Sequence, residues 1–246
     1  MTKKILNILM IIFGIICVCG IVYSLYNIFN WKKDVDSNKK LKIDIEKKIK
    51  FDEDDNKLKI DFNALKAQNP DTVGYIKVNG TDIDYVVVKT GDNDYYLNHD
   101  FNKNYNSAGW IFADYRNKFD TSDNNIVIYG HNMRDGSMFG TLKNILKSDW
   151  QNDINNREIV LVTELGQYRY QVFSVYSRSA EEYYINTDFN TTEEYISFIN
   201  EMKYRSFYDF GVEVNEFDKI LTLSSCIGYG SDRVVLHAKL INDAAE

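Results

Sequence analysis

Proline, cysteine and histidine are all scarce in this chain of 246 residues, which contains one Pro, three Cys and three His. A single proline leaves long stretches free to form strands and helices without obligatory breaks. Two of the cysteines, Cys17 and Cys19, lie inside a long apolar run near the N-terminus. Cys226 is then the only cysteine in the polar remainder of the chain, so that part cannot form an internal disulfide.

Positive charge is also limited. The net charge is −7, and no basic patch with interleaved aromatic residues occurs, which argues against a nucleic-acid partner. No group of residues has the spacing of metal ligands, so we expect neither a metal nor another cofactor. With 44% apolar residues, the chain can bury one sizeable core.

The N-terminus carries the longest apolar run. Lys3 and Lys4 precede residues 5–29, which few polar side chains interrupt and which are long enough to cross a bilayer as a helix. The run is too long for a signal-peptide core, and no A-x-A-like cleavage site follows it. A buried globular helix is the alternative. We predict that residues 1–30 form a short cytoplasmic N-terminus and a single transmembrane anchor, with the rest of the chain outside the cell.

Residues 31–60 are rich in Lys, Asp and Glu, which indicates a charged stalk between the anchor and the folded domain. Leu41, Ile45 and Ile49 recur at helical spacing, so part of the stalk is predicted to be an amphipathic helix that packs on the domain. The rest is expected to be a solvated spacer.

Residues 61–246 show many short strand patterns and few helical ones. We expect strands from residue 73 to the Asn79-Gly80 turn and at 82–89, 108–114, 125–129, 158–163, 168–177, 219–225 and 233–241. Helical patterns cover 61–69, with Asp61 as its cap, 139–147 and 192–205. Without alternation of strands and helices, this order favours a mostly antiparallel β-barrel or sandwich in one domain.

Cys226 closes one predicted strand, and Arg233 opens the next. If the two strands pair as antiparallel neighbours, the thiol and the guanidinium lie side by side at one end of the sheet. A nearby positive charge favours the reactive thiolate, and a guanidinium can donate hydrogen bonds to an oxyanion. The alternative is that Cys226 is a buried structural cysteine and Arg233 a surface residue.

A cysteine nucleophile usually needs a histidine as its acid–base partner. His131 follows the strand at 125–129 through Gly130, at a strand exit where side chains can face a cleft, and it is the strongest candidate. His237 lies in the middle of a strand, where we expect a packed or a surface strand residue. His99 lies in a polar loop, where we expect a surface role or a local hydrogen bond.

Taken together, these residues resemble the catalytic signature of the sortases. The resemblance is carried by Thr222-Leu223-Ser224-Ser225-Cys226, by the following Arg233, and by Tyr129-Gly130-His131-Asn132 upstream. Residues 69–76, 94–101 and 108–117, and the insert that contains the 192–205 helix, are similar to class B of that family. Ser225 stands where a threonine is more common before the cysteine, and Val86 stands where a proline is common.

The resemblance implies an eight-stranded sortase β-barrel with an N-terminal helix and an inserted helix before the catalytic strand. It implies a membrane-anchored cysteine transpeptidase of a Gram-positive-type cell surface, with His131, Cys226 and Arg233 as catalytic residues. Such an enzyme cleaves a C-terminal sorting motif of secreted proteins after Thr, through a thioacyl-enzyme, and transfers them to a peptidoglycan amine. By family position, the substrate-binding residues would be Asn93, Leu97, Tyr184, Ile185 and Ser224.

Two other interpretations remain open. One is a different exported cysteine hydrolase of the papain type, although the lack of disulfides and the residues around Cys226 speak against it. The other is a non-catalytic cell-surface binding module in which the cysteine is structural.

Overall fold

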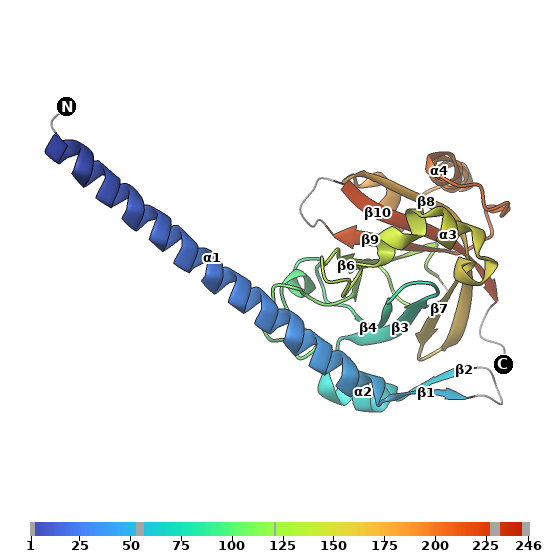
Figure 1. The fold of residues 1–246 in the computed structure, drawn as a ribbon. Helices are drawn as coiled ribbons and strands as arrows, with labels where there is room; N and C mark the ends of the chain where they lie inside the picture. Colours follow the sequence, from blue (N-terminus) through green and yellow to red (C-terminus); the bar gives the residue numbers. More distant parts are fainter. Residues whose placement is uncertain (1–2, 53–56, 121, 227–231, 243–246) are drawn as a thin grey trace.

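A computed structural model describes residues 3–52, 57–120, 122–226 and 232–242. Eight strands form a closed β-barrel in the order β10-β8-β7-β3-β4-β5-β6-β9 (Figure 1). The strands are β3 (Thr72–Val78), β4 (Asp84–Val88), β5 (Phe112–Ala113), β6 (Asn125–His131), β7 (Glu158–Thr163), β8 (Gly166–Ser179), β9 (Ile220–Cys226) and β10 (Asp232–Asn242). The predicted eight-stranded barrel is confirmed.

Most neighbouring strands are antiparallel, but β6 and β9 run parallel, with partners from Asn125↔Ile220 to His131↔Cys226. The pair β9–β10 is antiparallel, as the sequence predicts. Since β6 and β9 run in the same direction, their last residues, His131 and Cys226, lie at the same end of the barrel.

Alternate residues of β9 and β10 belong to two different layers. Leu221, Leu223 and Leu236 lie in the main core of the barrel, whereas Ile220 and Val235 pack in a second cluster with side chains of α4 (Thr192–Arg205). The helix α4 has the bounds that its sequence predicts. It begins after Thr191, whose hydroxyl accepts a hydrogen bond from the backbone N–H of Glu194 at 3.1 Å.

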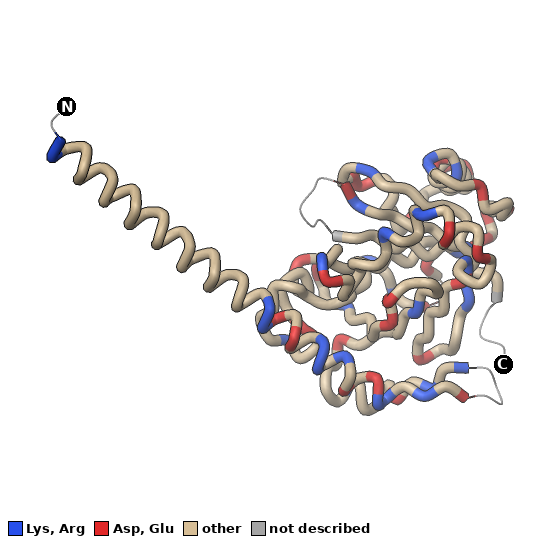
Figure 2. Tube along the Cα trace, viewed as in Figure 1, with Lys and Arg blue, Asp and Glu red and all other residues tan. Residues whose placement is uncertain are grey.

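The N-terminal helix α1 (Lys3–Glu46) is continuous over 44 residues and projects away from the barrel (Figure 1). It is the one helix among the described residues that is long and apolar enough to cross a membrane. Figure 2 shows that charged residues are absent from most of the projecting part and appear where α1 reaches the barrel. There the helix buries Val35, Asn38, Leu41 and Ile45.

The stalk differs in part from its prediction. Leu41 and Ile45 do pack on the domain, but α1 ends at Glu46, so Ile49 lies beyond the helix in β1 (Ile49–Asp52). This strand pairs with β2 (Lys57–Ile60) in a separate two-stranded sheet. The described residues of the expected solvated spacer therefore form a helix and a small sheet, and apolar side chains such as Ile49, Leu58 and Ile60 pack against the core of the domain.

Several short elements connect the barrel strands. They are α2 (Phe62–Gln68), η1 (Tyr95–Leu97), η2 (Leu142–Leu146), α3 (Ser148–Asn152), η3 (Ile154–Arg157) and η4 (Tyr183–Ile185). Asp61 caps α2 as predicted, through a 2.9 Å hydrogen bond from the N–H of Ala64. The strand predicted at 108–114 is reduced to β5, because Gly109 has φ of 58° and the chain turns there.

The helix predicted at 139–147 is also different in the structure. The segment contains the 3-10 turn η2, and the α-helical turn α3 follows only at Ser148. Leu142, Ile145 and Trp150 from these two elements are all buried, so their contacts with the core set the local conformation.

Candidate active site

A pocket of about 390 Å³ opens at the end of the barrel where β6 and β9 finish. Its wall consists of Asn93, Asp94, Leu97, Phe112, Tyr129, His131, Ile185 and Arg233. Two of the three predicted catalytic residues, His131 and Arg233, therefore lie in one pocket. Three of the five predicted substrate-binding residues, Asn93, Leu97 and Ile185, line the same pocket.

Cys226 is the last residue of β9, and its backbone partner in β6 is His131. The other neighbour of β9 is β10, and there Val235 lies opposite Ser224. Because the two strands are antiparallel, Cys226 (two residues after Ser224) and Arg233 (two residues before Val235) lie toward the same end of the strand pair. The side chain of Cys226 lies outside the described residues, and so does the predicted contact between its thiol and the guanidinium.

His131 is half-buried, and its Nε2 lies 2.6 Å from the carbonyl oxygen of Leu97. A carbonyl only accepts, so the ring proton is on Nε2, and Nδ1 carries the lone pair that can accept a proton. Gly130 lets this part of β6 pass close to the core. A Cβ atom at Gly130 would lie 2.4 Å from Ile111 and 2.7 Å from Phe139.

Arg233 has a donor that nothing in the described part of the protein satisfies. Its Nε atom is buried and lacks a hydrogen-bond partner there. Leaving a buried donor unpaired costs about 1–3 kcal/mol. An acceptor oxygen on a ligand in the pocket would remove this cost.

Tyr184 and Ser224 do not line the pocket. Both side chains are buried, and the hydroxyl of Tyr184 lies 3.1 Å from Oγ of Ser224. These two residues thus form a contact behind the wall, and their predicted binding of substrate stays a prediction.

Sequence reasoning missed Asp94, Phe112 and Tyr129 as pocket residues. Tyr129 could have been found from its position, because it precedes His131 by two residues and so shares a face of β6 with it. Phe112 and Asp94 belong to segments whose folding toward the pocket no local pattern indicates.

The two other histidines occupy the places that the sequence predicts. His99 stacks on Tyr95, with 4.0 Å between ring centroids, and its Nδ1 lies 2.7 Å from the carbonyl of Tyr95. His237 is fully buried in β10. Neither histidine lines the pocket.

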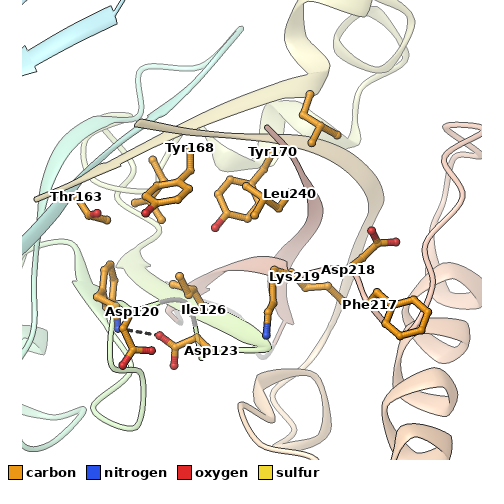
Figure 3. A pocket seen from close by; sticks show the side chains of 14 residues that line it. Asp120, Asp123, Ile126, Thr163, Tyr168, Tyr170, Phe217, Asp218, Lys219 and Leu240 are labelled. Atoms are coloured by element: carbon orange, nitrogen blue, oxygen red, sulfur yellow. Dashed lines mark hydrogen bonds between the residues drawn. The ribbon is translucent and has the colours of Figure 1, made fainter. Parts of the chain in front are cut away.

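Figure 3 shows the side chains that line a second cavity, of about 400 Å³, which the lining residues place at the opposite end of the barrel. Its walls include Ile126 at the beginning of β6 and Leu240 near the end of β10. Its charged groups already have partners, since Asp123 accepts a 2.7 Å hydrogen bond from the N–H of Phe119 and Asp218 pairs with Lys239 at 3.0 Å. The cavity contains none of the predicted catalytic residues.

Metal ligands do not cluster in the described ranges of the chain, where no group of three or more His, Cys, Asp or Glu side chains could hold an ion.

Comparison with known proteins shows the family. A family model described as the sortase domain matches residues 76–241, more than half of the chain. Sortase B of Listeria monocytogenes is 36% identical over 184 residues, which cover 74% of this chain and 74% of that protein. Sortase B of Staphylococcus aureus is 36% identical over 183 residues, which cover 73% of this chain and 74% of that protein.

Solved structures give the same result. Sortase B from B. anthracis in complex with AAEK1 matches with a TM-score of 0.76 at 36% identity, over 86% of this chain and 99% of that chain. Sortase B of Clostridium perfringens matches with a TM-score of 0.69 at 39% identity, over 74% of this chain and 100% of that chain.

The matched region extends from β3 to β10 and therefore includes every strand that contributes to the pocket. The chain belongs to the sortase family. Because these relatives are all sortases of class B, the enzyme is a cysteine transpeptidase of the sortase B type, as the sequence predicted.

Proposed function

We propose that this enzyme cleaves a C-terminal sorting motif of secreted proteins after a threonine and joins the threonine carbonyl to an amine of peptidoglycan. Cys226 is the nucleophile, His131 the acid and base, and Arg233 the group that stabilises the oxyanion. The observation that carries the proposal is the pocket that contains both His131 and Arg233 at the end of the barrel where β9 finishes with Cys226.

In the first half of the reaction, the Cys226 thiolate attacks the threonine carbonyl and forms a carbon–sulfur bond. The carbonyl oxygen becomes an oxyanion, to which Arg233 donates a hydrogen bond from its Nε–H, a donor without a partner in the described part of the chain. The amide carbon–nitrogen bond then breaks, and protonated His131 gives its Nδ1 proton to the leaving amine. The 2.6 Å contact between Nε2 and the Leu97 carbonyl keeps the ring in this orientation.

In the second half, an amine of a peptidoglycan precursor or cross-bridge attacks the thioester. His131 accepts the proton that this amine loses, the carbon–sulfur bond breaks, and the thiolate is regenerated. Without an acceptor amine, water resolves the thioester slowly. Asn93, Leu97 and Ile185 contact the sorting motif from the pocket wall. Tyr184 and Ser224 complete the set of substrate-binding residues, and their contact with each other supports the pocket wall from behind.

The helix α1 supports a proposed location for the enzyme. The apolar part of the helix crosses the cell membrane once, the short N-terminus is cytoplasmic, and the barrel is extracellular. The length of residues 5–29, about 37 Å as a helix, is sufficient for a hydrocarbon core of about 30 Å.

The test is cleavage of fluorogenic sorting-motif peptides by the full-length chain in detergent micelles, beside Cys226→Ala. Cleavage should occur for at least one motif in a panel of class B-like and Leu-Pro-containing peptides. Adding an amine should shift the product to the amine adduct, and Cys226→Ala should abolish both products. If no peptide is cleaved and Cys226 resists alkylation, the protein is a binding module.

A second variant in the same assay tests the proposed role of Arg233. Arg233→Lys keeps the charge but removes the Nε–H donor, so kcat/KM should fall by about 10²–10³-fold. Circular dichroism of the variant checks that the barrel is folded. Wild-type kcat/KM in a folded Arg233→Lys enzyme would exclude oxyanion stabilisation by this residue.

A further inference from the structure

A single buried carboxylate lies behind the pocket, at the exit of β5. Asp114 has no exposed side-chain surface, yet its two oxygens accept five hydrogen bonds. Three come from Arg116: its Nε at 2.8 Å, its Nη2 at 2.8 Å and its backbone N–H at 3.0 Å. A buried carboxylate is stable only when donors replace the water that it loses.

The other two donors come from the pocket wall. The hydroxyl of Tyr129 donates to Asp114 at 2.8 Å, and Nδ2 of Asn93 donates to the same carboxylate oxygen at 3.0 Å. Asn93 and Tyr129 both line the pocket, and they are 36 residues apart in the chain. The carboxylate therefore joins the loop before η1 to the strand that ends in His131.

Arg116 extends the connection to the opposite wall. The Nη2 atom that bonds Asp114 also donates to the carbonyl oxygen of Ile185 at 2.8 Å. Ile185 is the last residue of η4, in the insert between β8 and α4, and it lines the pocket. Through one ion pair, the wall formed by Asn93 and Tyr129 is held to the wall formed by Ile185.

The protonation states support a permanent ion pair. Burial raises the pKa of Asp114, but the hydrogen bonds from Arg116 and Tyr129 outweigh burial, and the pKa lies below its usual range. The hydrogen bond to Asp114 raises the pKa of Arg116 above its usual value. Both groups are charged at neutral pH, so these contacts stay charge-assisted.

We propose that Asp114 and Arg116 are positioning residues that hold the two walls of the pocket at the separation required by the peptide substrate. The inference rests on the proposed function in naming a peptide as the ligand. The pair does not touch the reacting atoms. It acts through Asn93, Tyr129 and Ile185, whose placement determines how well an extended peptide fits between them.

The experiment compares Arg116→Met with Arg169→Met in the full-length chain in detergent micelles. Methionine keeps an unbranched, flexible side chain but has neither the charge nor a donor. Arg169 is a matched control, because it is 29% exposed against 32% for Arg116 and forms its own ion pair with Glu158, at 2.6 Å, on the barrel wall between β7 and β8. Arg116→Lys is included because one ammonium keeps the charge without the planar two-partner geometry.

For the peptide that the wild type cleaves best, Arg116→Met should raise KM about tenfold while kcat changes less than about threefold. Arg116→Lys should fall between Arg116→Met and the wild type, and Arg169→Met should match the wild type. A purely structural role would instead reduce the folded fraction, which lowers kcat and leaves KM unchanged. That pattern would overturn the proposal.

Hydrogen–deuterium exchange provides a readout that does not need activity. In Arg116→Met, backbone amides of residues 93–97 and 183–186 should exchange faster than in the wild type, with no such change in Arg169→Met. Faster exchange confined to residues 114–118 would refute the link between the walls. If the wild type cleaves no peptide, the proposed function fails, and the exchange result alone decides whether Asp114 and Arg116 hold the pocket.

Discussion

Burial affects the two polar side chains at Arg233 and His237 in different ways, although both lie on β10. Nε of Arg233, at the pocket, has no hydrogen-bond partner among the residues that the structure describes. His237 is fully paired: its Nδ1 lies 2.8 Å from Oγ1 of Thr222, and its Nε2 lies 2.9 Å from the hydroxyl of Tyr176. Only the first arrangement leaves hydrogen-bonding capacity for a ligand.

The pairing of His237 also determines its tautomer. The hydroxyl of Thr222 donates to Oδ1 of Asn125 at 2.7 Å, so it must accept from Nδ1–H of the ring. Nε2 then accepts from the hydroxyl of Tyr176. A second ring proton on Nε2 would force the hydroxyl of Tyr176 to accept and to turn its own proton to Sδ of Met202, a weak acceptor at 3.2 Å. The pairing is therefore better in the neutral ring, which suits this histidine to a structural position.

This environment predicts a pH-dependent stability. Burial, with a smaller contribution from the charge of Arg205, lowers the pKa of His237 from 6.5 to about 3. Below pH 6.5 the unfolded chain binds a proton that the folded protein does not. This histidine should therefore reduce the free energy of unfolding by about 1.4 kcal/mol per pH unit as the pH falls from 6.5 toward 3. Its stabilising effect is complete above pH 6.5.

Denaturant unfolding between pH 7 and pH 4.5 measures the effect in the full-length chain in detergent micelles. His237→Gln should show a shallower loss of stability with falling pH than the wild type. Equal slopes for the wild type and His237→Gln would contradict the prediction.

At the scale of elements, α1 is both a candidate membrane span and part of the folded domain. Asn38 donates to the carbonyl of Gly109 at 3.1 Å, and Nζ of Lys42 lies 4.2 Å from the centroid of the Tyr85 ring. Asp34 accepts a 3.0 Å hydrogen bond from the N–H of Ser107. The C-terminal part of α1 is therefore a packed element, and its apolar contacts should contribute to stability.

Two isoleucines on this part of α1 provide a matched pair for testing that contribution. Ile45 is 2% exposed and belongs to the main core, whereas Ile43 is 59% exposed. Ile45→Ala should lower the free energy of unfolding by about 2–4 kcal/mol, because it removes buried methylene groups and leaves a cavity. Ile43→Ala should change it by less than about 0.5 kcal/mol. Denaturant titration followed by tryptophan fluorescence measures both values, and equal effects would show that the helix is not packed in solution.

At the scale of the whole molecule, one continuous helix joins the apolar run to the barrel. Phe29, at the end of the apolar run, and Val35, the first buried residue of α1, are six positions apart, which is about 9 Å of helix. If residues 5–29 cross the membrane, the barrel is held close to the bilayer surface. This geometry suits an enzyme whose proposed substrates pass through the same membrane.

The proposed orientation is tested with single cysteines in a chain that lacks Cys17, Cys19 and Cys226. Tyr204→Cys places a thiol on α4, where the side chain is 86% exposed. A membrane-impermeant maleimide should label this thiol on intact cells. It should label Thr2→Cys only after lysis, because Lys3 and Lys4 favour a cytoplasmic N-terminus. The reverse pattern would place the barrel inside the cell.

Local patterns were sufficient for several elements and for two pocket residues. The apolar length of residues 5–29, the cap and spacing of α4, and the short apolar run of β7 each depend on neighbours within a few positions. His131 and Arg233 were identified because each lies at the end of a predicted strand and within a short motif, and both features can be recognised from neighbouring residues. A strand pattern alone does not specify which strands pair. The closed barrel was therefore predicted from the family resemblance and not from the strand pattern.

Tertiary structure alone decided the contacts between distant segments. It placed Tyr184 against Ser224 behind the pocket, separated Ile49 from the helix predicted to contain it, and brought Asn93, Tyr129 and Ile185 to one ion pair. Short-range periodicity was enough to locate most strands and the long apolar helix, and the reactive residue types could be read directly from the chain. Which side chains share a pocket depends on closing the barrel, and no short-range pattern contains that information.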